Sequence, residues 1–546
     1  MVKPYTGNFG EPELMHLLRR TLFGASPSDL NFFKGKTLEE VVNSLLNFSA
    51  NPPSPPIRAY QGKNQTTFDS LTPFGQTWIN TKIIAAEQNP NGVRRGSYKQ
   101  WWMQLMAQQE RTMREKLVLF WHNHLVTDSN DVVSIAQLAY RYNALLRANC
   151  AGNFRKLIYD MTIEPAMLRY LNGEKSIASA PDENYGRELQ ELFCVGKGPD
   201  SKYTEDDVKA AAKVLTGWTI NYADDFQPVF RANRHDNKDK QFSAFYNNKI
   251  IKGDNTANGG SNEINQFLDM IFANQEVAKF IVRKFFTFFC YYEITDETES
   301  NLIVPLADEF RSSGYELKPM LRSLFTSEWF FKNEYRGAMI KSPADYTIGM
   351  IRQMEIDWPS APLAFEARYY FSGQIYNAIL AQGQEIGDPP NVAGWPAYYQ
   401  TPSFYELWID TALYPPRLAV NDTLVIKNLN TGGSGSTQWI NAESKQKVFK
   451  IDPILFVSKL SKPSDPNVLI NEVVFFFYGA SISQSIKDSL KTTYLLKGQA
   501  TDYYWTDAYN NYINNPGNPG TDGRQVPKQL QDLFSYMFSA AEYHLH

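Results

Sequence analysis

Apolar residues recur every three or four positions along most of the chain, which is the pattern of amphipathic helices that share a core. Clear examples are the segments 11–23, 111–122 and 183–195. Residues that stop helices follow at suitable places, such as Gly24 and Gly196. The sequence therefore predicts a mainly α protein, built as a multi-helix body.

Capping residues predict several helix boundaries within this body. The polar residues 128–131 end one helix and cap another that runs to about Asn149, and residues 152–153 start a third that runs to about Leu171. Thr204 and Asp207 have the spacing of a capping box and open a helix that ends near Thr216.

The helical pattern is interrupted at residues 219–262, which are rich in Asn, Asp and Gly with short aromatic stretches. Such a composition is typical of short strands joined by turns, so we expect a small β-hairpin or ribbon inserted into the helical body. Residues 49–75, rich in Pro, Gly, Ser and Asn, are expected to form an extended surface arm.

The domain organisation is predicted from one flexible segment, 428–437, whose sequence NLNTGGSGST is typical of a linker or a disordered loop. It divides a main helical domain, 1–427, from a C-terminal helical unit, 438–546. That unit resembles 276–332 in its order of helices and aromatic residues, which suggests two related units packed together. The alternative is that any two sets of aromatic amphipathic helices look alike.

Composition excludes several classes of protein. Hydrophobic residues make up 43% of the chain, which is enough for a large core and argues against a disordered protein. The net charge is only −4 and no long basic block occurs, so we expect no nucleic-acid partner. No run of about 18 apolar residues occurs, so no transmembrane segment is predicted. Cys150, Cys194 and Cys290 are widely spaced without a CxxC pair, which argues against a disulfide framework or a zinc ribbon.

The sequence also lacks several targeting and catalytic signatures. The start, MVKPYTGNFG, has no apolar segment of a secretory signal, so the protein is expected to be cytoplasmic, to be trimmed, or to be exported with a partner. It has no Walker A motif, no G-x-S-x-G elbow, no HExxH pair and no Rossmann glycine pattern. No nucleotide cofactor is therefore expected.

Three of the six histidines are the candidate metal ligands: His122, His124 and His235. The first two form an H-x-H pair, which converges on one ion only if the helix ends near Asn123, because helical residues two apart point about 200° apart. Neutral imidazoles suit a divalent transition metal such as Zn, Fe or Mn. The alternative is that these rings satisfy backbone carbonyls. His16 is expected in the core, and the last two histidines at a terminus that often frays.

The segment 182–193, DENYGRELQELF, is the densest polar candidate. On a helix Asn184, Glu188 and Glu191 share one face, flanked by Arg187. A carboxylate there could bind metal or act as a base, and the guanidinium could orient an anionic substrate. The alternative is a solvated face with Arg187 paired to Glu183 or Glu191.

Two further segments carry candidate residues. His235 and Asp236 lie in the predicted ribbon with Lys240 four residues on, a pattern of either an acid–base pair or a simple turn. The rigid turn 387–396, GDPPNVAGWP, offers Trp395 as a pocket wall or sugar-stacking platform, although a structural corner is the simpler interpretation. Trp121, beside the H-x-H pair, is a further candidate substrate contact.

Seven segments, in chain order, resemble the bacterial family called domain of unknown function 1800. They are HLLRRTLFG, EKLVLFWHNHLV, GNFRKLIYDMTIEPAML, ENYGRELQELFCVG, YTEDDVKAAAKVLTGW, HDNKDK and PPNVAGWP, and the pair LFTSEWFF and KSPADY also fits. The resemblance supplies no reaction. It implies signature positions at His122, His124, Glu183, Arg187, Glu188, Glu205, His235, Asp236 and Trp395. It also implies that a sulfatase-like or phosphatase-like exported protein is a possible partner, since members are often encoded beside such proteins.

Two hypotheses follow. In the first, the protein is a metal-dependent enzyme, most simply a hydrolase, in which His122, His124 and His235 hold the metal while a carboxylate from Glu183, Glu188 or Asp236 acts with Arg187. Asn184, Lys240, Trp121 and Trp395 would then contact the substrate. In the second, it is a non-catalytic helical module that binds a partner protein or a surface glycan. Polar residues around an open pocket would favour the first hypothesis, and a closed, internally satisfied network would favour the second.

Overall fold

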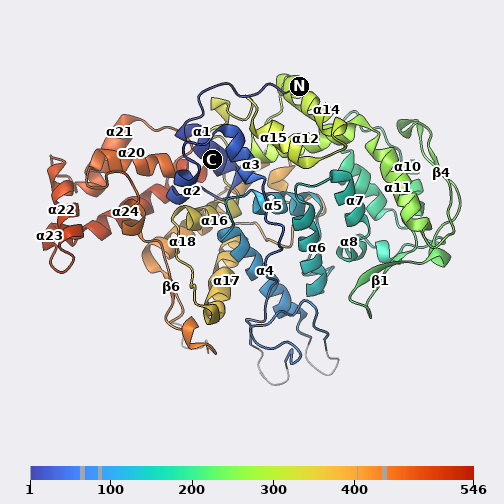
Figure 1. The fold of residues 1–546 in the computed structure, drawn as a ribbon, viewed down its shortest axis with the longest axis horizontal. Helices are drawn as coiled ribbons and strands as arrows, with labels where there is room; N and C mark the ends of the chain where they lie inside the picture. Colours follow the sequence, from blue (N-terminus) through green and yellow to red (C-terminus); the bar gives the residue numbers. More distant parts are fainter. Residues whose placement is uncertain (1, 62–67, 84–88, 402–403, 433–438) are drawn as a thin grey trace.

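The computed structural model describes residues 2–61, 68–83, 89–401, 404–432 and 439–546. Helices dominate these residues, and the only strands among them form three two-stranded antiparallel sheets, so the predicted mainly α fold is confirmed. The molecule is elongated: the C-terminal helices lie at one end and the strands that follow α10 lie at the other (Figure 1).

The first half of the chain contributes the helices that surround the centre. They are α1 (Glu11–Thr21), α2 (Pro27–Phe33), α3 (Leu38–Leu45), α4 (Asn91–Ala107), α5 (Arg114–His124), α6 (Ala136–Asn149), α7 (Phe154–Thr162), α8 (Pro165–Tyr170), α9 (Asn184–Glu188) and α10 (Glu205–Val214).

The second half continues around the same core. Its helices are α11 (Gly259–Phe272), α12 (Gln275–Phe289), α13 (Asp296–Thr298), α14 (Val304–Ser312), α15 (Leu317–Phe325), α16 (Pro343–Gln353), α17 (Phe365–Ala381) and α18 (Tyr414–Asn421). The C-terminal helices are α19 (Pro453–Val457), α20 (Pro466–Phe477), α21 (Gln484–Leu490), α22 (Tyr503–Asn514), α23 (Gly520–Gly523) and α24 (Val526–Ser539).

Helix α5 lies at the centre of the molecule and is buried almost all round. Two of its three charged residues near the start are paired inside the protein, Glu115 with Arg147 and Lys116 with Asp345. A helix surrounded by other elements needs apolar or paired side chains on every face. This burial places the end of α5, with His122 and His124, in the interior.

Capping chemistry explains several helix boundaries. The side chain of Thr204 accepts from the backbone of Asp207 and the Asp207 carboxylate accepts in return, so the predicted capping box is present at the start of α10. The expected single helix from residue 153 to about Leu171 is wrong, since α7 ends at Thr162 and α8 begins at Pro165. Proline disfavours helical backbone at the residue before it, and Glu164 is extended here.

The predicted ribbon is confirmed as two small sheets. Strands β1 (Trp218–Asn221) and β2 (Gln227–Phe230) pair antiparallel, as do β3 (Lys240–Gln241) and β4 (Ile250–Ile251). A third pair, β5 (Leu429–Asn430) with β6 (Val448–Phe449), was not predicted; β5 lies within the proposed linker and β6 beyond it. Residues 433–437 of that linker lie outside the described residues.

The C-terminal unit packs on the rest of the chain. The side-chain amide of Asn421 in α18 donates to the backbone oxygen of Ser535 in α24 at 2.8 Å. The last residues pair with the segment after α15, where Lys341 N donates to His544 O at 2.7 Å. His544 is 2% exposed, so the expectation that this end frays is wrong, because backbone pairing holds it. The division into two domains and the internal repeat remain predictions.

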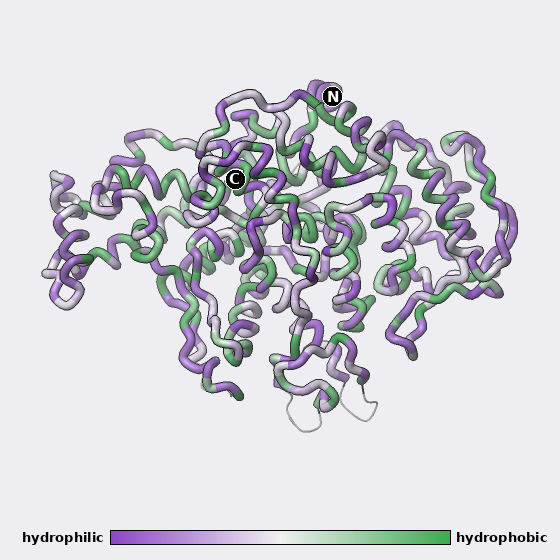
Figure 2. Tube along the Cα trace, in the orientation of Figure 1, coloured by the Kyte–Doolittle hydropathy of each residue, from purple (hydrophilic) through white to green (hydrophobic). Residues whose placement is uncertain are grey.

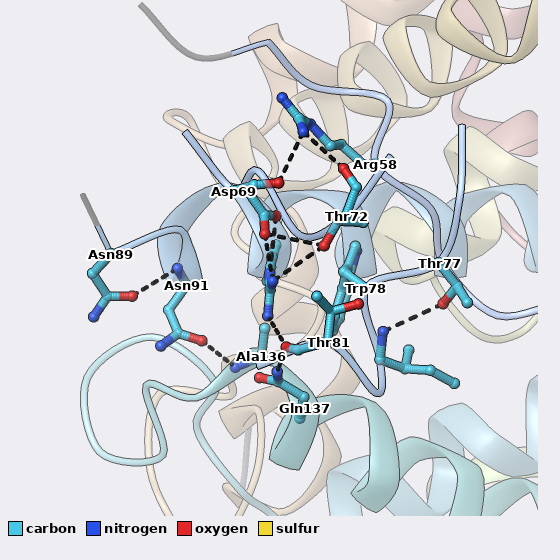
Figure 3. A network of polar contacts seen from close by, with 12 residues as sticks. Arg58, Asp69, Thr72, Thr77, Trp78, Thr81, Asn89, Asn91, Ala136 and Gln137 are labelled. Atoms are coloured by element: carbon cyan, nitrogen blue, oxygen red, sulfur yellow. Dashed lines mark hydrogen bonds and ion pairs between the residues drawn. The ribbon is translucent and has the colours of Figure 1, made fainter. Parts of the chain in front are cut away.

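The described parts of the segment predicted as a surface arm, 49–61 and 68–75, are held in place by a buried ion pair (Figure 3), and residues 62–67 lie outside the described residues. Asp69 and Arg94 are almost fully buried, and Arg94 Nε donates to Asp69 Oδ2 at 3.0 Å. Arg58 donates to the backbone oxygens of Asp69 and Thr72. The loop is thus anchored on α4 rather than lying free on the surface.

Hydrophobic and hydrophilic residues alternate over short distances along the whole trace (Figure 2), as amphipathic helices around a shared core require. The three cysteines are free and buried, in agreement with the sequence prediction. Among the described residues no helix is both long and apolar enough to cross a bilayer.

Candidate functional site

His122 is held inside the protein by hydrogen bonds at both ring nitrogens. Gly387 N lies 3.2 Å from Nε2 and can only donate, so Nε2 is the acceptor and Nδ1 carries the proton. Nδ1 then donates to the Tyr142 hydroxyl at 3.1 Å, which in turn donates to Leu125 O. Burial lowers the pKa of His122 to about 3. The ring is therefore a neutral structural group that ties α5 to the turn at residue 387.

His124 differs, because only one of its nitrogens has a partner. Nε2 lies 3.0 Å from the backbone oxygen of Phe193, which can only accept, so Nε2 is protonated. Nδ1 keeps its lone pair and makes no hydrogen bond within the described part of the chain. Burial, with a smaller contribution from Lys284, lowers the pKa of His124 to about 3. His124 thus presents a neutral acceptor nitrogen.

His235 lies in a closed ionic cluster at the other end of the molecule. Its Nδ1 is 2.8 Å from Thr216 O, and its Nε2 is 3.0 Å from Glu263 Oε1. Lys240 Nζ is 2.6 Å from Glu263 Oε2, and all three side chains have no exposed surface. Asp236 uses its carboxylate to accept from the backbone N–H of Lys238. These residues fasten the ribbon to α11.

The structure does not bring the three predicted metal ligands together. Each imidazole has its own set of partners, and the described residues contain no group of three or more His, Cys, Asp or Glu placed to hold a metal ion. The physical reason for His122 and His124 is that α5 continues to residue 124, so the two rings leave a regular helix in different directions.

The predicted polar face of α9 is partly a solvated salt-bridge network. Arg187 pairs with Glu205 at 2.7 Å and with Glu183 at 3.2 Å, and the Glu205 carboxylate raises the pKa of Arg187. Asn184 N donates to Asp182 Oδ1 at 2.9 Å. Glu188 is half-buried, and burial, followed by the nearby Glu191, raises its pKa.

The two predicted tryptophan contacts are buried in the core. Trp121 has no exposed surface and donates from Nε1 to Cys150 O at 2.8 Å. Trp395 is 1% exposed and packs against the His122 ring, 5.6 Å between centroids. The structural-corner interpretation of the turn therefore fits Trp395 better than a stacking platform does.

The turn that contains Trp395 is bonded directly to the end of α5. Trp395 N donates to Asn123 Oδ1 at 2.9 Å. Gly394 has φ +91°, and a Cβ there would lie 2.3 Å from the same oxygen. Glycine is therefore required at 394 both by its backbone conformation and by the close approach of Asn123.

A cavity of about 240 Å³ opens beside His124, between the end of α5, the segment after α9, α12 and the turn. We call it the His124 pocket. Its walls are formed by Phe120, Asn123, His124, Glu191, Leu192, Lys197, Phe280, Lys284, Thr287, Phe288, Ala393, Tyr398 and Tyr399. One cavity is therefore bordered by three of the segments that carry the family resemblance, or by the residues directly after them. These segments contain FWHNH, ENYGRELQELF and PPNVAGWP.

A π-helical turn presents Glu191 to this pocket. Residues Leu189–Cys194 continue α9 with the wider π spacing, which is rare and often found at functional sites. Glu191 forms an ion pair with Lys197, whose side chain is 67% exposed. Since an exposed lysine contributes little to holding a carboxylate, Glu191 stays available to a ligand.

Lys284 supplies an unpaired charge to the same pocket. Its Nζ lies 5.4 Å from the centroid of the Phe280 ring, and no acidic side chain pairs with it in the described ranges. Burial lowers the pKa of Lys284 to about 8. Sequence reasoning missed this residue because α12 has the pattern of an ordinary apolar helix, with no motif around position 284.

The comparisons with known proteins agree with these motifs. Residues 16–545 match the profile of the family described as Protein of unknown function (DUF1800). No curated protein and no solved structure gives a significant match. Because the match covers nearly the whole chain, the protein belongs to the DUF1800 family.

Proposed function

We propose that the protein is an enzyme whose active site is the His124 pocket. The observation that carries the proposal is the meeting of three resemblance segments, far apart in the chain, around one cavity that also holds unpaired polar groups. A concave, largely apolar pocket with a few converging polar side chains is the usual form of a small-molecule site.

Hydrolysis is the reaction class that these residues support best. The Glu191 carboxylate can accept a proton from a water molecule in the pocket, and the unprotonated Nδ1 of His124 can accept a second hydrogen bond from that water or from the substrate. Glu188 lies near enough to Glu191 for that carboxylate, after burial, to raise the pKa of Glu188.

A metal-dependent form of this reaction is also proposed, with a smaller set of protein ligands than the sequence predicted. Histidine ligands of metals commonly donate their other N–H to a backbone carbonyl, as His124 does to Phe193. His124 Nδ1 and Glu191 would be the ligands. The metal would then polarise the attacking water or the substrate.

The test is a pair of variants measured on a panel of p-nitrophenyl esters, phosphates, sulfates and glycosides. Loss of a general base costs about 10²- to 10⁴-fold in rate, so Glu191→Gln is expected to lose that much on any substrate that the native protein hydrolyses. Lys197→Met, which removes only the exposed partner, should keep the rate. Equal rates in Glu191→Gln and the native protein would refute the proposal.

Metal content separates the two forms of the mechanism. If the metal form is correct, purified native protein binds about one equivalent of a divalent transition metal and His124→Ala binds none. If the native protein and His124→Ala bind equally little metal while Glu191 remains necessary for turnover, the metal-free form of the mechanism is supported.

A second candidate function is the non-catalytic module. The observation in its favour is that His235, Glu263 and Lys240 form a closed ionic cluster with no exposed side-chain surface, as a structural network would. A protein that hydrolyses no member of the panel, yet binds a partner protein or a glycan with unchanged affinity in Glu191→Gln, would support this alternative.

A further inference from the structure

Charges in the His124 pocket do not cancel. Two lysines and a single carboxylate line the pocket, so one positive charge is in excess, and the ion pair that Glu191 makes is with the exposed Lys197 and not with Lys284. His124 is neutral because burial lowers its pKa to about 3. The ammonium of Lys284 is therefore left without a counter-charge among the described residues.

An unpaired ammonium in such a half-buried place costs the protein alone some free energy. Charged groups removed from water normally pair with an opposite charge, since the protein interior screens charge poorly. Lys284 contacts the face of Phe280 instead, and its burial lowers its pKa to about 8, so the group is still mostly charged near neutral pH. An anion that enters the pocket would supply the missing partner.

The other walls of the pocket are flat and apolar. The rings of Phe288 and Tyr398 are stacked, with centroids 5.1 Å apart, and Phe120 meets Phe288 edge-on at 5.3 Å. Phe280 lies 5.9 Å from the His124 ring. These surfaces fit the flat apolar part of a ligand and hold it by area and by ring contacts.

We propose that Lys284 binds the anionic group of the substrate, and that the substrate class is a small oxyanion, such as a carboxylate, phosphate or sulfate, attached to a flat apolar body. This inference rests on the proposed function of the same pocket and names its ligand. Lys284 is thereby a substrate-binding residue, while Glu191 and His124 remain the groups that handle the proton.

Calorimetric titration tests the inference with benzoate, phenyl phosphate and phenyl sulfate, and with benzamide as a neutral ligand of the same shape. The native protein is expected to bind at least one anion more tightly than benzamide. Lys284→Met should lower the affinity for that anion by at least about tenfold, because a charge-assisted contact is lost, and should leave the affinity for benzamide unchanged. Lys197→Met, an exposed lysine of the same pocket, should keep the anion affinity within about threefold of the native value.

A second measurement does not depend on activity. The rate at which trinitrobenzenesulfonate modifies each lysine is followed by peptide mass spectrometry over a range of pH. Lys284 is expected to react with a midpoint near pH 8, and the bound anion should slow the reaction and raise the midpoint, because it stabilises the charged form. Folding is checked by the melting temperature, which Lys284→Met should not lower, since it removes an unpaired charge.

The outcomes separate the two proposals. The inference is overturned if Lys284→Met binds the anions as tightly as the native protein does. It is also overturned if the native protein binds no anion more tightly than benzamide. If this happens while Glu191→Gln still abolishes turnover of a neutral substrate, the proposed function survives without it. If the anions bind through Lys284 but Glu191→Gln keeps full activity, the binding site stands and the proposed catalysis fails.

Discussion

Replacing Glu263 with glutamine should leave the ammonium of Lys240 buried without a carboxylate. Glu263 accepts from Lys240 at 2.6 Å and lies 3.0 Å from His235 Nε2, and the three side chains have no exposed surface. After the substitution, the Asp236 backbone oxygen and the new amide oxygen remain as neutral acceptors. The ion pair itself is lost.

The magnitude follows from the cost of an uncompensated charge. Removing one partner of a buried ion pair costs about 3–5 kcal/mol. Because glutamine keeps the shape and one acceptor oxygen, we expect the lower end, a loss of about 3 kcal/mol in the free energy of unfolding. Removing both charges together, in Glu263→Gln with Lys240→Met, should cost clearly less, since no unpaired ammonium then remains.

Urea denaturation followed by tryptophan fluorescence measures these differences, with the single variant Lys240→Met completing the double-mutant cycle. The ribbon can also open locally, so hydrogen exchange of residues 235–263 should be measured in parallel. A loss below about 1 kcal/mol in Glu263→Gln, together with unchanged exchange, would refute the reasoning that this cluster carries the ribbon. So would a double variant that loses the sum of the two single losses.

Three further predictions concern other parts of the chain. Burial raises the pKa of Glu164 from its ordinary 4.5 to about 7, so ionisation of this carboxyl destabilises the folded state. The destabilisation is absent below the ordinary pKa and complete above about 7. In urea titrations at about pH 8, but not at about pH 4, the free energy of unfolding of Glu164→Gln should exceed that of the native protein by about 3 kcal/mol. Gly394→Ala should lose at least about 1–3 kcal/mol by thermal denaturation and distort the His124 pocket, because φ is +91° and Asn123 is too close; a native melting temperature would contradict this. Arg187→Gln should leave the melting temperature nearly unchanged, since its partners are exposed, and a large loss would show that the network is structural.

Local patterns allowed much of the fold to be predicted. The capping box of Thr204 and Asp207 and the strands of the ribbon depend on neighbouring residues, and the structure has them. The break at Pro165 could have been predicted from the proline alone. The π-helical turn at Leu189–Cys194 carries no such local signal.

The candidate site was only partly accessible from the sequence, because it depends on contacts between distant residues. His124 was predicted as a metal ligand together with His122, and this stays a prediction. The two rings differ because Gly387 N–H donates to His122, whereas Phe193 O accepts from His124. The partner of His235 is Glu263, whose position on α11 no pattern around residue 235 indicates. Lys284 is distinguished only by the charges missing around it.

The His124 pocket takes its walls from positions as far apart as 120 and 399, so it exists only when most of the chain has folded. A ligand that binds there cannot recognise a partly unfolded protein, and its binding free energy therefore adds to the stability of the whole body. At a ligand concentration 100 times Kd the gain is about 2.7 kcal/mol. Screening a library of metabolites by the rise in Tm should therefore find the natural ligand before its chemistry is known.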